Sequence, residues 1–114
     1  MRIASITIDC TDPHRLAGFW SGLMNLSVTD IGGDYAELAP ILPDGPTLLF
    51  LQVPEEKRTK NRVHLDVAVT DVRYTVDQAL TMGATQAEGD LAGPFDWVVL
   101  LDPEGNEFCV CPSG

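Results

Sequence analysis

The chain has 114 residues, a formal net charge of −10 and a hydrophobic content of 45%. This length predicts a single domain over residues 1–114, with enough apolar side chains for a core that needs no disulfides. The negative charge disfavours nucleic acid and anionic membranes as partners and suits a cationic small molecule. No apolar run approaches the roughly 20 residues of a membrane-spanning helix, and the N-terminal residues lack the pattern of a secretory signal.

The three cysteines form an odd set, in which Cys109 and Cys111 are separated by one residue and Cys10 lies far away in sequence. They do not fit a disulfide framework, so we expect a reducing, cytoplasmic location. Zinc sites usually space their first two cysteines by about two to four residues. We therefore interpret Cys109 and Cys111 as small buried side chains on one face of a strand.

The first half of the chain begins with alternating residues that predict a strand over 3–10. Asp12 followed by Pro13 is typical of a helix N-terminus, and the apolar spacing predicts a helix that ends near Asn25 and buries Phe19 and Trp20. Three further strands are expected at 26–30, 34–39 and 47–53.

The second half repeats this order after a polar segment, residues 55–61, that we interpret as an exposed linker between modules 1–54 and 62–114. A strand ends before the helix cap Asp71, a helix runs to Gly83, and strands are expected at 84–88, 96–101 and 106–111. Asp12 and Asp71 are 59 residues apart, about half the chain, which indicates internal duplication. The predicted fold class is α+β, with two βαβββ modules forming an incompletely closed eight-stranded sheet around a cleft.

The polar residues of the first strand of each module should face away from the helices, because strand side chains alternate between two faces. Those predicted to bind a ligand are Ser5, Thr7, Asp9, His64 and Asp66, and Cys109 on the last strand joins them if Phe108 and Val110 face the helix. His64 is the candidate acid, base or anion-binding group; the alternative is a histidine that only forms hydrogen bonds with a neighbouring strand or with residues 60–62. Trp97 is a further candidate, as an aromatic wall of the cleft or a cover for its mouth.

Several motifs resemble the vicinal oxygen chelate superfamily, which includes glyoxalase I, bleomycin-resistance proteins and extradiol dioxygenases. They are TDP at 11–13, RLAGFWSGLMNL at 15–26, the second-module strand that starts at His64, and LDPEGNEFCV at 101–110. The resemblance is strongest to small glyoxalase-like domain proteins and extends over nearly the whole chain. DPEGNEF is its most specific part.

The resemblance implies one divalent ion, held by His and Glu side chains from the first and last strands of each module. On this pattern His64 matches a ligand, whereas Ser5 and Cys109 occupy two other ligand positions, and the fourth falls on Leu49, Leu51 or Gln52. Such a set would bind a hard ion poorly. We therefore expect no cofactor; if a divalent metal binds (Zn, Fe, Mn, Mg or Ni), His64 is its one clear ligand.

Three classes of function follow from the resemblance. The first is a metal-free protein of the bleomycin-resistance kind that binds a small cationic or aromatic molecule. The alternative is a metal-dependent lyase, isomerase or dioxygenase, and the third is a protein interaction module. Members of the superfamily commonly dimerise, and symmetric pairing would cover exposed sheet edges, so we also expect a homodimer.

Overall fold

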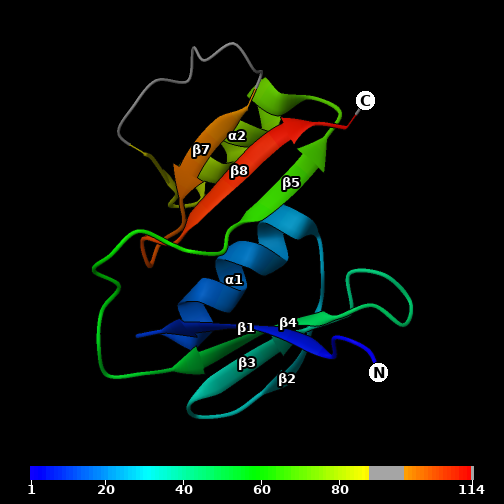
Figure 1. Cartoon of the computed structure of the whole chain (residues 1–114), viewed down its shortest axis with the longest axis vertical. Coiled ribbons are helices and arrows are strands. Elements are labelled where there is room, and N and C mark those ends of the chain that lie inside the picture. The colour runs from blue at the N-terminus through cyan, green and yellow to red at the C-terminus, as the bar shows by residue number, and fades with distance from the viewer. Residues whose placement is uncertain (88–96, 114) are drawn as a thin grey trace. The chain divides into compact units, whose positions relative to one another are not determined.

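The computed structural model describes residues 1–87 and 97–113, which form two compact units, Met1–Lys57 and Arg58–Gly114 (Figure 1). The boundary falls inside the polar segment 55–61 that was predicted to join the modules. Each unit contains one helix and a four-stranded open sheet in the order βαβββ. The predicted α+β class and its two repeated modules are therefore confirmed.

The first unit has a sheet with strand order β1-β4-β3-β2, in which β1 and β4 run parallel. The remaining neighbours are antiparallel. Its elements are β1 (Ser5–Cys10), α1 (Pro13–Met24), β2 (Val28–Ile31), β3 (Tyr35–Leu38) and β4 (Thr47–Gln52).

The second unit repeats this arrangement with strand order β5-β8-β7-β6, in which β5 and β8 run parallel. Its elements are β5 (Leu65–Val69), α2 (Val72–Thr81), β6 (Thr85–Gln86), β7 (Val98–Leu101) and β8 (Glu107–Pro112). Glu88 and Asp96, at the ends of two predicted strands, lie outside the described residues. The repetition of strand order as well as element order supports an origin by duplication.

The two helices begin in the same way. The side chain of Asp12 accepts a hydrogen bond from the backbone N–H of Arg15 at 3.1 Å, and that of Asp71 accepts one from Tyr74 at 3.0 Å. Each carboxylate thereby satisfies a backbone donor that the first helical turn leaves without an intrahelical partner. The helix starts predicted from the two aspartates are confirmed.

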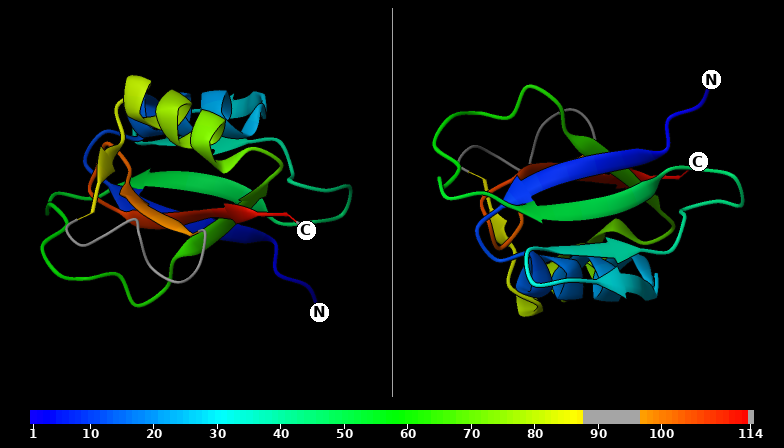
Figure 2. Two further views of the ribbon diagram at one scale, coloured as in Figure 1. Left: turned by 90° about the horizontal axis from the view of Figure 1, so that it is seen from above. Right: turned by 90° about the horizontal axis from the view of Figure 1, so that it is seen from below.

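Each helix packs against the sheet of its own unit, α1 over β3 and β4 and α2 over β8 (Figure 2). In the first unit Phe19 and Trp20 are buried as predicted, with their rings edge to face at 5.4 Å. Burial of these two aromatic side chains fixes α1 on the sheet. In the second unit the helix-facing side chains Leu100, Phe108 and Val110 are almost completely buried.

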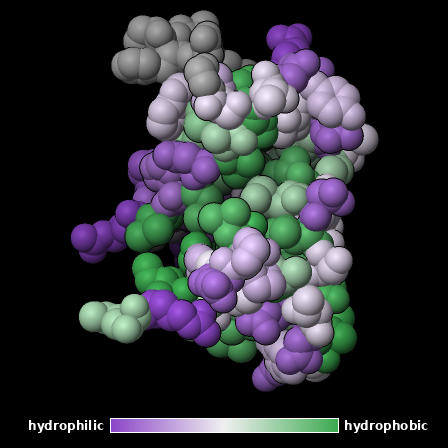
Figure 3. All heavy atoms as spheres, turned by 90° about the vertical axis from the view of Figure 1, so that its right-hand side faces the viewer, coloured by the Kyte–Doolittle hydropathy of each residue, from purple (hydrophilic) through white to green (hydrophobic). Residues whose placement is uncertain are grey.

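Large apolar side chains also reach the surface, including Val28 and Ile31 on the edge strand β2. Figure 3 shows hydrophobic and hydrophilic residues interspersed over one face of the molecule. Among the described helices, none has the length and apolar character needed to cross a membrane.

Candidate functional site

The face of the second sheet that points away from α2 is defined by the pairing of β5 with β8. Leu65 pairs with Phe108 on the helix side, and the next pair, Asp66 with Cys109, therefore lies on the opposite face. Cys111 follows two residues later on this same face. We call it the open face of the second unit.

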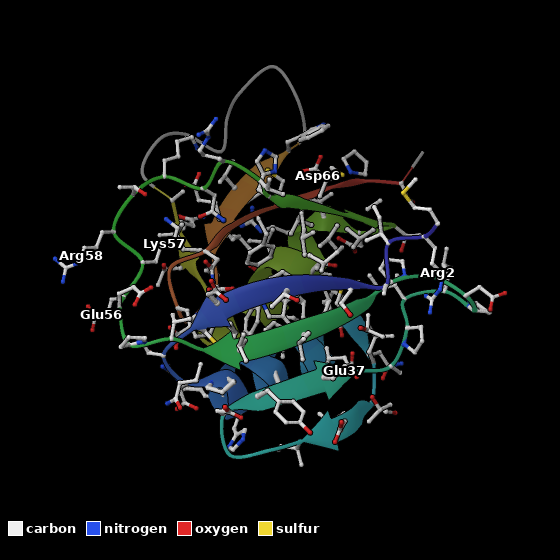
Figure 4. The ribbon with its side chains drawn as sticks, turned by 60° about the horizontal axis from the view of Figure 1, so that its bottom comes forward. Arg2, Glu37, Glu56, Lys57, Arg58 and Asp66 are labelled. Atoms are coloured by element: carbon white, nitrogen blue, oxygen red, sulfur yellow. The ribbon has the colours of Figure 1, made fainter. Side chains whose placement is uncertain are left out.

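Three side chains with different donor atoms converge on the open face. Nδ1 of His64 lies 3.1 Å from Oδ1 of Asp66, and a histidine ring nitrogen, a carboxylate oxygen of Asp66 and Sγ of Cys109 all lie within 4.8 Å of one another. The side chains of His64 and Asp66 are 44% and 41% exposed, whereas Cys109 is buried. Figure 4 shows Asp66 on β5.

The Cys109 thiol has its pKa raised, first by burial and then by the negative charge and hydrogen bond of Asp66, with smaller effects from Cys111 and Glu107. Both the loss of hydration and a nearby anion disfavour the thiolate. Because the thiolate is the nucleophilic form, Cys109 is not an activated nucleophile in the metal-free protein.

Glu107 anchors the segment that leads into His64. Its carboxylate pairs with Lys60 Nζ and accepts a hydrogen bond from the backbone N–H of Asn61 at 3.1 Å. In return, the backbone N–H of Glu107 donates to the Asn61 side chain at 3.3 Å. These contacts hold the chain in place directly before His64, a role that the prediction of an exposed linker missed.

The polar residues predicted on the first strand belong to the first unit. Ser5 is half-buried, and Thr7 and Asp9 are exposed. Thr47 Oγ1 lies 2.7 Å from a carboxylate oxygen of Glu37 and 3.1 Å from Oγ of Ser5, so three neighbouring strands share one hydrogen-bonded cluster. Glu37, labelled in Figure 4, was not predicted as a site residue, although it alternates with buried Ala36 and Leu38.

Strand pairing identifies the counterparts of the open-face residues in the first unit. Thr7 pairs with Leu49 across β1 and β4, just as Asp66 pairs with Cys109 across β5 and β8. Ser5 and His64 both precede their helix cap by seven residues. Of the three alternatives for the fourth position, Leu49 is therefore the counterpart of Cys109.

The residues at these positions do not fit the metal site that the resemblance implies. A hard divalent ion needs several carboxylate or imidazole donors, and leucine offers none while serine is a weak one. His64, Asp66 and Cys109 are a different set, with one nitrogen, one oxygen and one sulfur donor inside a single unit. This set suits a borderline ion such as Zn²⁺ better than Mg²⁺ or Mn²⁺.

The second unit has two further surface features, an exposed tryptophan and a groove. Trp97, the predicted aromatic wall, is 45% exposed and directly precedes β7. A groove of about 630 Å³ lies on the helix side, lined by residues that include Val72, Val76 and Val98. Val98 pairs with Val110 on the helix-facing side, so this groove is not part of the open face.

Residues 5–111 match the family model of the glyoxalase-like domain. No functionally curated protein matches the chain.

Solved structures share the fold at low sequence identity. A glyoxalase/bleomycin resistance protein/dioxygenase family enzyme from Burkholderia phytofirmans is 18% identical with a TM-score of 0.76, covering 96% of this chain and 97% of that chain. Glyoxalase I from Leishmania major is 18% identical with a TM-score of 0.68, covering 98% of this chain and 86% of that chain. A mutant of the fosfomycin resistance protein FosX from Listeria monocytogenes, complexed with Mn(II), is 12% identical with a TM-score of 0.76, covering 98% of this chain and 90% of that chain.

Proposed function

The chain belongs to the glyoxalase-like domain family, and from this we propose that it binds a small molecule at the open face of the second unit. The observation that carries the proposal is the convergence of an imidazole, a carboxylate and a thiol within 4.8 Å of one another. We further propose that the four-ligand metal site of the superfamily is absent, because Ser5 and Leu49 stand at two of its positions.

The chemistry of the open face favours a cationic ligand. Asp66 is 41% exposed and supplies a negative charge beside His64, and the chain as a whole carries a formal charge of −10. A cation would gain both the local contact and the long-range attraction. Trp97, 45% exposed in the same unit, offers an aromatic surface for a flat or cationic group.

The structural relatives are consistent with a small-molecule ligand. The FosX mutant was solved with 1S,2S-dihydroxypropylphosphonic acid, and another relative is described as a glyoxalase/bleomycin resistance protein from Albidiferax ferrireducens. At the observed identities these likenesses show the fold, so the choice of ligand for this chain rests on its own charges.

The proposal is tested by thermal shift of metal-stripped protein with matched panels of cationic and neutral aromatic compounds. A cationic compound at about 100 times its Kd should stabilise the protein by about 2.7 kcal/mol, and neutral analogues should have a smaller effect. Asp66→Asn should abolish the difference between the panels. Asp77→Asn, which changes an exposed carboxylate of α2, is the matched control. Equal stabilisation by both panels, or an unchanged response in Asp66→Asn, would contradict the proposal.

The alternative function, a metal-dependent lyase, isomerase or dioxygenase, is favoured by one observation, the three donor side chains of the open face. If this alternative holds, a reaction catalysed by the protein should stop when a chelator removes the metal and should return when the metal is restored. Assays of lyase and oxygenase chemistry with and without chelator separate it from binding alone.

We also propose a cytoplasmic location and a homodimer. Cys10, Cys109 and Cys111 are all buried, and none of them is in a disulfide within the described residues, which suits a reducing compartment. Among residues 1–87 and 97–113, the end strands of each sheet pair with one neighbour in that sheet, and a symmetric dimer would cover such edges.

A further inference from the structure

We propose that His64, Asp66 and Cys109 bind one Zn²⁺ ion within the second unit. This donor set differs from the implied four-ligand site, since it needs no residue of the first unit and uses Asp66, which follows His64 on the same strand face. The inference uses the same three side chains as the small-molecule proposal. Its test is metal binding, which can fail while binding of cationic compounds to the metal-free protein persists.

The distances in the cluster are close to those of a zinc site. At bond lengths of roughly 2.0 to 2.3 Å, tetrahedral ligand atoms are about 3.3 to 3.7 Å apart. His64 Nδ1 and Asp66 Oδ1 are already 3.1 Å apart, and the three donor atoms lie within 4.8 Å of one another. We expect rotation of the half-exposed His64 and Asp66 side chains to close the remaining gap around an ion.

The backbone around the cluster is held in place. Asp66 and Cys109 are directly paired on neighbouring parallel strands, and Glu107 fixes the segment before His64 through Asn61. Rigid placement of ligands on strands lowers the cost of ordering them when a metal binds. The exposure of His64 and Asp66, at 44% and 41%, gives the ion a path from solvent.

The donor types select zinc over the harder ions. Thiolate and imidazole favour Zn²⁺, whereas Mg²⁺ and Mn²⁺ prefer oxygen ligands. Binding would replace the thiol proton of Cys109, which is released to solvent as the sulfur–zinc bond forms. Three protein ligands leave a fourth position for water or another small molecule.

The first unit provides an internal comparison. It has the same strand order and pairing, but places Ser5, Thr7 and Leu49 where the second unit has His64, Asp66 and Cys109. Leucine has no donor atom and the hydroxyl groups are poor zinc ligands. The expected stoichiometry is therefore one ion for each chain.

The test uses the full chain after removal of metal with a chelator. Zn²⁺ affinity is measured by competition with a chromophoric chelator, and Co²⁺ is added separately to detect a thiolate-to-cobalt charge-transfer band. We expect one Zn²⁺ per chain and a clear band. Cys109→Ser should remove the band and weaken Zn²⁺ binding more than about 100-fold. Removing a group that only hydrogen-bonds a metal ligand weakens binding about 10-fold to 100-fold, and loss of the ligand itself should cost more. His64→Ala and Asp66→Asn should also weaken binding at least about 10-fold.

The chain contains matched controls for the thiol and the imidazole. Cys111→Ser removes a buried cysteine on the same strand, and His14→Ala removes the other histidine, which contacts Gly32 instead. Both should retain the band and the affinity, and circular dichroism checks that every variant is folded. Absence of stoichiometric Zn²⁺ binding in the parent, or a band that survives Cys109→Ser, would overturn the proposal. A protein that binds no Zn²⁺ yet still responds to cationic compounds overturns the zinc site alone.

Discussion

Asp66 interacts with both of its neighbours on the open face. Its carboxylate lies 3.1 Å from Nδ1 of His64 and also raises the pKa of the buried Cys109 thiol. The same negative charge that suits a cation therefore adds to the effect of burial in disfavouring the thiolate.

The charge of Asp66 should affect the reactivity of the Cys109 thiol. Asp66→Asn should lower the pKa of the Cys109 thiol, because removing the negative charge and its hydrogen bond removes two causes of the raised value. The thiolate fraction, and with it the alkylation rate, should then rise at a lower pH. The measurement is the pH profile of iodoacetamide alkylation, made in metal-free protein with Cys10 and Cys111 replaced by serine.

Burial is the first cause of the raised pKa and is unaffected by Asp66→Asn. The alkylation midpoint of the variant should therefore remain at a higher pH than that of a cysteine in an unstructured peptide. Asp71→Asn, which alters a helix cap rather than the open face, is the control. An alkylation profile in Asp66→Asn that coincides with the parent profile would contradict the electrostatic explanation.

Side-chain alternation was enough to predict which residues share the open face, but not which of them meet. His64 and Asp66 follow from one strand, whereas the contact with Cys109 depends on the register of β5 against β8. A register is set by the turns and packing of the whole unit, which a local pattern does not encode. The role of Glu107 was missed for the same reason, because its partners Lys60 and Asn61 are distant in sequence.

At the scale of elements, the turn between β7 and β8 is held by one buried carboxylate. Asp102 is 3% exposed, and its Oδ1 accepts hydrogen bonds from the backbone N–H groups of Glu104 and Asn106 at 2.9 and 3.0 Å. The Asn106 side chain also donates to it. This turn forms the start of the DPEGNEF motif, so the motif has a structural role in placing β8 and Cys109.

We predict that Asp102→Ala lowers the free energy of unfolding by about 3 kcal/mol, because it leaves backbone donors without their acceptor. Asp102→Asn should cost less, since one oxygen remains to accept the two backbone hydrogen bonds. Urea denaturation of the three proteins measures both differences. Equal stability of Asp102→Ala and the parent would show that the turn does not depend on this carboxylate.

Helix starts were easier to predict than strand ends. Asp12 and Asp71 act locally, through a hydrogen bond to the residue three positions later, so their pattern is visible in the sequence. The strand predicted over 84–88 is only Thr85–Gln86 in the structure, with Glu88 outside the described residues. In the described part of the sheet, β6 is an end strand that pairs with β7. Its length is therefore set by how far it pairs with β7, which its own residues do not reveal.

At the scale of the whole molecule, we propose that residues 1–114 fold as one cooperative domain despite forming two compact units. Each unit has roughly the size at which a domain buries only about 60% of its unfolded surface. We therefore predict a single urea transition for the whole chain and no cooperative transition for an isolated fragment 58–114. Two resolved transitions of the whole chain, or a cooperative transition of the fragment, would contradict this.

A second prediction for the whole molecule concerns assembly. Val28 and Ile31 on edge strand β2 are 44% and 59% exposed, and covering such an edge would remove apolar surface and unpaired backbone groups from water. We expect a homodimer at micromolar concentration by light scattering. Ile31→Lys should shift the population toward monomer, whereas Tyr74→Lys, which changes an exposed side chain of α2, should not. A monomeric parent protein would refute the prediction.

The contacts of Glu107 also bear on how the chain could be cut. Lys60 and Asn61 are bound to β8, whereas Glu56 and Arg58 extend outward from the connection between the units (Figure 4). A protease that cleaves after Lys57 or Arg58 would separate the polypeptide into two fragments without releasing the segment that carries His64. The nicked protein should keep its Zn²⁺ affinity for as long as the fragments stay associated. A break in the covalent backbone at this point would leave the ligand set intact.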